Sequence, residues 1–165
     1  MGSKIYGATS IGNNCTVGGE IKNSILFSHS NKAHDGYLGD SAIGEWCNLG
    51  AGTSNSNVKN TATQVGYMLK HNAIISYSGI KGGLLMGDYS RAAINTSFNT
   101  GSVVGICCNI FGEKNPPKFT NNFTWGSEKY IFEKALRDIN NWMAFKNATL
   151  TEDKKQTLKQ LYEKV

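Results

Sequence analysis

This chain has few of the features that mark membrane, metal-binding or disulfide-rich proteins. It contains only two prolines, and no apolar run approaches the roughly 20 residues of a membrane span. The four cysteines, Cys15, Cys47, Cys107 and Cys108, show no C-x-x-C spacing, and no secretory signal precedes them. We therefore expect free thiols in a cytoplasmic protein, without a metal site, a disulfide framework or a membrane anchor.

Charge of one sign is not concentrated in a patch either. The formal net charge is +5, but much of the positive charge lies in the C-terminal tail, where it alternates with acids, as in EKALRD and TEDKKQ. Such a mixture is typical of a solvated helix face and not of a nucleic-acid interface. We expect no nucleic-acid partner.

Glycine is abundant but unevenly distributed. Of the 19 glycines, Gly126 is the only one after residue 112, which indicates two regions of different architecture. The chain has 165 residues and is 39% hydrophobic, which is enough for a continuous core. We expect a repeat region over residues 1–115 and a C-terminal linker with a two-helix extension over residues 116–165.

Apolar residues recur every six positions in the glycine-rich region. This period does not fit an amphipathic helix, whose apolar residues recur about every 3.6 positions. It is typical of a solenoid in which each hexapeptide forms one short strand and one turn, with one aliphatic side chain inside. The alternative is a β-sandwich with glycine turns, but sandwich turns do not keep strict phase. The series are Ile5, Ile11 and Val17; Tyr37, Ile43 and Leu49; and Met86, Ala92, Phe98, Val104 and Ile110.

The six-residue period stops between Asn57 and Met86. Apolar and polar residues alternate on both sides of a polar segment there, which predicts a β-hairpin extruded from the coil over about residues 62–80. His71 would lie at the hairpin tip as a solvated turn residue, and we assign it no role.

The last part of the chain has helical spacing. Pro116 and Pro117 end the repeat region, because proline cannot donate to a strand ladder. One helix is expected over about residues 128–145 and a second from near Thr151. Both should cap the open end of the coil or pack on its side. Their apolar stripes are Ile131, Ala135, Leu136, Ile139, Trp142 and Met143, and then Leu158, Leu161, Tyr162 and Val165.

The run HDGYLGDSAIGEWCNLGAGT, which begins at His34, resembles a known acetyltransferase domain. It is similar to H-x-x-Y-L-G-D-x-x-I-G-x-x-x-N-I-G-A-G-T of the bifunctional N-acetylglucosamine-1-phosphate uridyltransferase/glucosamine-1-phosphate N-acetyltransferase family. The segment MGDYSRAAINTSFNTGSVVG fits the next coils of that family, so the resemblance covers about residues 4–112. It implies a left-handed parallel β-helix, a homotrimer with active sites between subunits, and a nucleotidyltransferase domain that precedes this chain in a longer protein.

The resemblance also implies roles for individual residues. His34 would be the general base that takes a proton from the 2-amino group of glucosamine 1-phosphate as this amine attacks the thioester of acetyl-CoA. The unperturbed pKa of histidine, near neutrality, suits that task. Glu20 matches a carboxylate that orients this histidine, and Asn57 matches an asparagine near the reacting amide. The matching substrate contacts are Lys4, Lys22, Tyr37 and Asn48, and the matching coenzyme contacts are Ala51 and Gly112.

Some positions depart from the family pattern. Lys4 stands where the family has an arginine, Val58 replaces a tyrosine, and Ile94 replaces a serine thought to help at the thioester. An oxyanion donor is typically worth about 2.7–4 kcal/mol of barrier, so the loss of polar groups here bears directly on activity.

Two functions remain open at the level of sequence. The first is an acetyl-CoA-dependent N-acetyltransferase acting on an amino-sugar phosphate. The second is a structural module that trimerises a sugar nucleotidyltransferase and binds a sugar nucleotide as a regulator. In the second case His34, Asn48 and Asn57 are corner residues that satisfy the backbone. A glycine-rich nucleotidyltransferase signature is absent, so uridylyl transfer is not expected within these residues.

Overall fold

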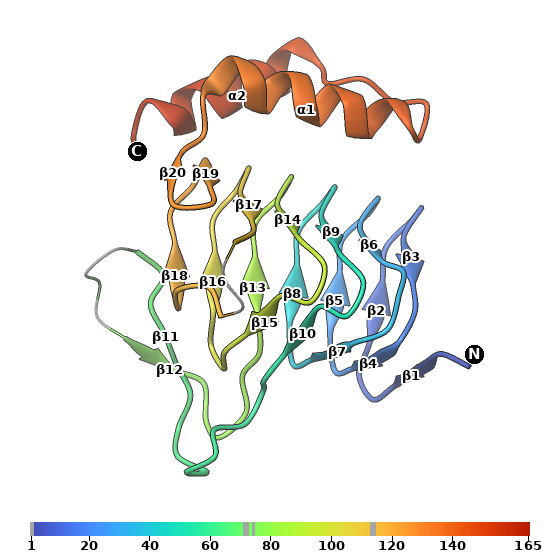
Figure 1. Cartoon of the computed structure of the whole chain (residues 1–165), viewed down its shortest axis with the longest axis vertical. Coiled ribbons are helices and arrows are strands. Elements are labelled where there is room, and N and C mark those ends of the chain that lie inside the picture. The colour runs from blue at the N-terminus through green and yellow to red at the C-terminus, as the bar shows by residue number, and fades with distance from the viewer. Residues whose placement is uncertain (1, 71–72, 74, 113–114) are drawn as a thin grey trace.

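The protein is a β-solenoid with a β-hairpin and C-terminal helices, as predicted (Figure 1). The structure is a computed structural model and describes residues 2–70, 73, 75–112 and 115–165. His71, at the predicted tip of the hairpin, lies outside the described residues. Within them, no helix combines the length and the apolar character that a membrane span requires.

The strands stack into three faces, which we name A, B and C in chain order. Face A contains the parallel strands β1 (Lys4–Tyr6), β4 (Glu20–Lys22) and β7 (Tyr37–Gly39), continued by the pair β10 (Ser54–Asn55) and β15 (Ser97–Phe98). Face B contains β2 (Ser10–Ile11), β5 (Ile25–Leu26), β8 (Ala42–Ile43), β13 (Leu85–Met86), β16 (Val103–Val104) and β18 (Phe119–Thr120). Face C contains β3 (Thr16–Val17), β6 (Asn31–Lys32), β9 (Asn48–Leu49), β14 (Arg91–Ala92), β17 (Asn109–Ile110), β19 (Thr124–Trp125) and the antiparallel β20 (Glu128–Lys129).

One side chain of each central strand points into the coil. The inward positions hold mostly aliphatic residues, such as Ile43 and Leu49, which are almost completely buried. Tyr37 is not the inward member of its six-residue series: its side chain is half-buried on the outside of face A, and the inward residue is Leu38, which is 2% exposed. Its contact with substrate stays a prediction. The corner at Asp40, where φ is 50°, is tight, so only five positions separate the inward Leu38 from Ile43.

The corner between faces B and C is a column of residues in the left-handed backbone region. Within it the rings of His29 and Trp46 stack with their centroids 4.1 Å apart. The more C-terminal members of the column form a second core with the helices, separate from the core inside the coil. The column consists of Asn14, His29, Trp46, Tyr89, Cys107 and Phe123.

The helices α1 (Phe132–Ala144) and α2 (Glu152–Tyr162) run along the stack of coils and cover this corner, so they pack on the side of the coil (Figure 1). α1 buries Ala135, Ile139 and Met143, whereas Ile131, expected on the same stripe, is 50% exposed because it precedes the helix. α2 begins after Thr151, whose hydroxyl accepts a hydrogen bond from the Lys154 amide.

The hairpin leaves the coil at the corner between faces A and B. Its strands β11 (Gly66–Tyr67) and β12 (Ser76–Tyr77) pair in antiparallel fashion. At the base of the insertion the Gly82 amide donates to the Asn57 carbonyl at 2.9 Å. The chain therefore returns to the coil beside the point where it left.

Candidate functional site

His34 lies at the corner between faces C and A, in the segment 33–36 that joins β6 to β7. Its side chain is exposed and lines two neighbouring hollows. One hollow, of about 540 Å³, lies over the corner, and the other, of about 410 Å³, lies on face C. Gly36, with φ of 118°, allows the next coil to approach closely, because a Cβ atom there would collide with the Thr53 carbonyl oxygen.

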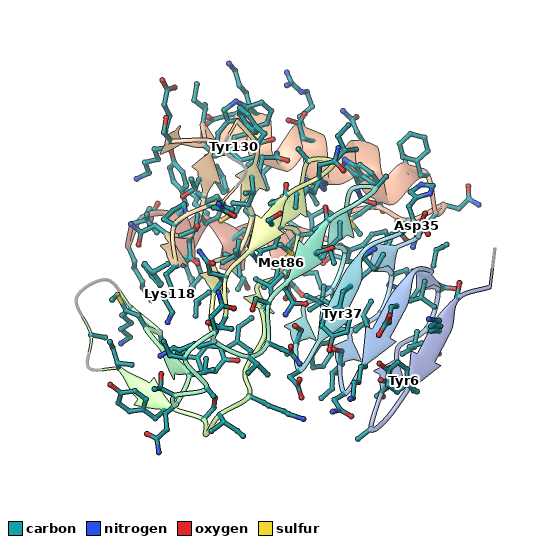
Figure 2. All side chains as sticks on the ribbon, turned by 60° about the horizontal axis from the view of Figure 1, so that its bottom comes forward. Tyr6, Asp35, Tyr37, Met86, Lys118 and Tyr130 are labelled. Carbon is teal, nitrogen blue, oxygen red and sulfur yellow. The ribbon has the colours of Figure 1, made fainter. Side chains whose placement is uncertain are left out.

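Glu20 and its neighbours form a polar row on face A. Lys4, Glu20 and Tyr37 are in register at outward positions. The Tyr6 hydroxyl donates to a Glu20 carboxylate oxygen at 2.7 Å, and this hydrogen bond raises the pKa of Tyr6. The Lys22 ammonium lies 5.3 Å from the centre of the Tyr6 ring. Glu20 therefore accepts a hydrogen bond from Tyr6, and its orientation of His34 stays a prediction. Figure 2 shows Tyr6 and Tyr37 on this side of the coil.

A second polar cluster lies between face A and the hairpin. The Asn57 side-chain amide donates to the Tyr37 hydroxyl at 3.1 Å and to the Asp40 carboxylate. The other oxygen of Asp40 accepts from the side-chain amide of Asn23. Burial raises the pKa of Tyr37, and the Asp40 carboxylate adds to the effect, so this phenol is protonated at neutral pH. Asn57 is thus connected to the outward row of face A through its hydrogen bond to Tyr37.

The remaining predicted residues fall in two places. Asn48 lies on face C in the same hollow as His34, in register with Asn31 and Arg91. Ala51 lines both hollows beside His34. Gly112, however, lines a different hollow at the C-terminal end of the coil. The predicted site residues other than Asn57 and Gly112 therefore lie on face A, on face C or at the corner between them, whereas Asn57 lies at the opposite edge of face A, beside the hairpin.

The two departures that replace a polar side chain with an apolar one, Val58 and Ile94, are both solvent-accessible. The Ile94 side chain is 68% exposed and lines both hollows beside His34. Val58 is 38% exposed directly after Asn57. An apolar side chain therefore stands next to His34 where the resemblance would place a hydroxyl.

Sequence reasoning missed Tyr6 and Asp40. Tyr6 follows Lys4 by two positions, and alternation along a strand places both side chains on one face. Asp40 belongs to the quoted motif, but its contacts with Asn23 and Asn57 depend on the folded corner. The two-residue period of a strand could have placed Tyr6 beside Lys4, whereas no pattern in the sequence predicts the contacts of Asp40.

Other catalytic chemistry has little support in the described residues. Burial raises the pKa of Cys47 to about 12 and that of Cys108 to about 11, and it also raises the pKa of Cys107. These thiols are therefore protonated and poor nucleophiles at neutral pH. Among the residues with described positions, no three His, Cys, Asp or Glu side chains gather as metal ligands would.

Comparison with known proteins supports a partial relationship. No family model matches the chain. It is 32% identical over 117 residues to the "Bifunctional protein GlmU" of Methanocaldococcus jannaschii, a match that covers 70% of this chain and 28% of that protein. It is 34% identical over 97 residues to the protein of the same name from Methanococcus aeolicus, covering 59% of this chain and 22% of the relative. A third, from Rippkaea orientalis, is 46% identical over 57 residues, which are 33% of this chain and 13% of the relative. The chain thus spans less than a third of the length of these relatives.

Proposed function

We propose that this chain is an acetyltransferase domain that transfers the acetyl group of acetyl-CoA to the amine of an amino-sugar phosphate, with glucosamine 1-phosphate as the first candidate. The observation that carries the proposal is the position of His34. It is an exposed histidine at a corner, with a hollow on either side and with Asn48 and Ala51 beside it. The partial similarity to proteins named bifunctional protein GlmU supports the same function.

In the proposed reaction the amine forms a bond to the thioester carbonyl carbon while His34 takes its proton. When the carbon–sulfur bond breaks, the leaving thiolate receives that proton, so His34 returns to its starting state. Lys4 and Lys22 on face A provide positive charge for the phosphate of the acceptor, each as a point charge. Tyr37, held by Asn57, supplies a fixed hydroxyl for the sugar.

The exposed Ile94 leaves the proposed site without one hydroxyl beside His34. A missing oxyanion donor costs about 10²- to 10³-fold in turnover in other enzymes. We therefore expect slow acetyl transfer.

We also propose that the domain works as a homotrimer. In a three-fold ring each copy touches two neighbours through two different surfaces. The helices occupy the B–C corner, and α1 also covers part of face C, since Trp142 lies over Arg91, which is only 7% exposed. Faces A and B are therefore the surfaces through which each copy would contact its two neighbours. Packing face B of one copy against face A of the next would place Glu20 and Lys22 in the cleft between copies.

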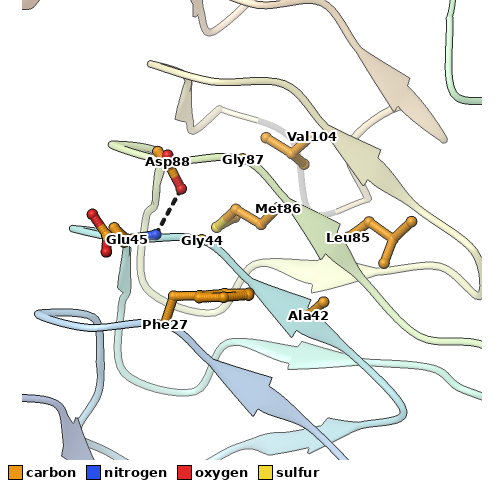
Figure 3. Close-up of a pocket in the computed structure, with 9 residues that line it drawn as sticks. All are labelled: Phe27, Ala42, Gly44, Glu45, Leu85, Met86, Gly87, Asp88 and Val104. Atoms are coloured by element: carbon orange, nitrogen blue, oxygen red, sulfur yellow. Dashed lines mark hydrogen bonds between the residues drawn. The ribbon is translucent and has the colours of Figure 1, made fainter. Parts of the chain in front are cut away.

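Face B has the apolar surface that such an interface needs. Its outward row includes Ile25, which is 45% exposed, and Leu85, with Phe27 beside them at 52%. Phe27, Ala42 and Leu85 also line a hollow of about 460 Å³ on this face (Figure 3). Contiguous exposed apolar side chains of this kind mark interaction surfaces.

The function is tested by thiol release from acetyl-CoA with glucosamine 1-phosphate. We expect wild-type turnover, a loss of about 10²- to 10⁴-fold in His34→Ala, as for a missing general base, and no loss in Asn121→Ala, an exposed asparagine outside the site. If the folded wild-type protein releases no thiol with this or related amino-sugar phosphates, the proposal fails. The alternative, a trimerisation module that binds a sugar nucleotide, would then be tested by titration with UDP-N-acetylglucosamine.

A further inference from the structure

Lys32 interrupts the aliphatic ladder inside the coil immediately before the corner that carries His34. It is the inward residue of β6 and is 1% exposed. Other strands of face C place Val17, Leu49 and Ala92 at this position. Removing an ammonium from water costs several kcal/mol unless the protein provides hydrogen-bond partners. Burying this lysine therefore costs desolvation free energy at a position that other coils fill with an aliphatic residue.

The ammonium of Lys32 has partners in the His34 corner itself. Its Nζ donates to the carbonyl oxygen of His34 at 2.6 Å and to that of Asp35 at 2.8 Å. The Asp35 oxygen also accepts the Gly52 amide of the next coil at 2.9 Å. Burial lowers the pKa of Lys32, and the Asp35 carboxylate acts in the opposite direction. One cation therefore fixes two consecutive carbonyls and a link to the neighbouring coil.

The equivalent corners of the next coils close without a buried charge. After β9, the Thr53 amide donates to the Gly50 carbonyl at 3.1 Å. After β14, the Thr96 hydroxyl donates to the Ala93 carbonyl at 2.8 Å. The coil can thus turn this corner with local hydrogen bonds alone. What distinguishes the corner held by Lys32 is that it carries His34.

We infer that Lys32 is a positioning residue for His34: its ammonium fixes the backbone of residues 34 and 35 and so the place of the imidazole above the two hollows. The inference rests on the proposed function, because that function gives His34 its task. It assigns Lys32 no contact with substrate. A displacement of a catalytic group by about 1 Å can cost about 100-fold in rate, so removal of the ammonium should affect turnover more than binding.

The test is Lys32→Met, which keeps a long side chain but is apolar like the other members of the ladder. Replacing a buried charge with an apolar group of similar volume is often neutral or stabilising, so we expect no fall in the melting temperature. We expect kcat to fall by about 10- to 100-fold, with a smaller change in the KM of the acceptor. The Gly52 amide should also exchange faster with solvent. Ile110→Met, in the same ladder but in β17, is the matched control and should leave all of these values unchanged.

The outcomes separate this inference from the proposed function. Wild-type kcat together with wild-type Gly52 exchange in Lys32→Met would overturn the inference. If the wild-type chain itself transfers no acetyl group, the proposed function fails, and the amide exchange still decides whether Lys32 fixes the corner. If neither Lys32→Met nor Lys32→Leu folds, Lys32 serves the stability of the coil, which also overturns the inference.

Discussion

Asn55, like Lys32, is a polar residue at an inward position, and it replaces backbone hydrogen bonds that the coil lacks. Its side-chain oxygen accepts the Gly39 amide at 2.8 Å, and its side-chain nitrogen donates to the Gly39 carbonyl at 3.0 Å. Beside it, the Ser54 hydroxyl accepts the Tyr37 amide. Side chains therefore join β7 to β10 where the strands do not form a backbone ladder, which satisfies buried groups that would otherwise be unpaired.

Replacing Asn55 with leucine should destabilise the protein although leucine suits the ladder elsewhere. The Gly39 amide would lose its partner, while the Gly39 carbonyl would keep only the hydrogen bond from the Ser41 hydroxyl. An unsatisfied buried polar group costs about 1–3 kcal/mol. We expect the free energy of unfolding, measured by urea denaturation, to fall by at least about 1 kcal/mol. Asn60→Leu, at an exposed position, is the control. Equal stability of Asn55→Leu and wild type would show that Gly39 finds other partners.

Individual residues also show what the sequence can and cannot predict about the site. The motif from His34 onward could be recognised, because residue types at fixed spacing carry it. The direction of Tyr37 could not, because one corner with five positions instead of six turns its side chain outward. The partner of Glu20 could not be predicted either, since the Tyr6 hydrogen bond depends on the register of β1 against β4.

At the scale of elements, Lys146 ties the end of α1 to the N-terminal coils. The Lys146 ammonium, just after the helix, donates to the carbonyls of Asn14 and His29 and to the side-chain oxygen of Asn31. The sequence predicted both helices from their apolar spacing, but it left open where they pack. Their place depends on the left-handed column with Trp46 and its neighbours, which no six-residue period reveals.

Replacing Lys146 with methionine should loosen this end of α1 while the coil stays folded. Hydrogen bonds from charged donors each contribute about 1.5–3 kcal/mol, and three acceptors lose their donor together. We expect faster amide hydrogen exchange in the last turn of α1 and near His29, with unchanged exchange inside the coil. Lys134→Met, an exposed lysine on the same helix, should have no such effect. If amide exchange in the last turn of α1 is the same in Lys146→Met as in wild type, the apolar contacts alone hold the helix.

At the scale of the whole molecule, the three faces differ in what they offer a partner. The outward row of face A carries charged and hydroxyl groups, including Lys4 and Glu20. Face C is partly covered by α1. Face B is apolar and has neither helix over it. The period of the sequence predicted the solenoid, but only the register of the folded strands shows that the apolar residues outside the coil gather on one face.

If face B joins copies of this chain, a charge placed on it should separate them. Ile25 is 45% exposed in β5, so Ile25→Glu leaves the inside of the coil intact but would bury a carboxylate in the interface. An unpaired buried charge costs several kcal/mol, enough to shift a trimer to monomers at micromolar concentration. Light scattering should give the mass of three chains for wild type and the mass of one chain for Ile25→Glu. The control Gln160→Glu, at an exposed position of α2, should keep the mass of three chains. A trimeric Ile25→Glu would place the contact on another surface, and a monomeric wild type would require the site around His34 to be complete within one chain.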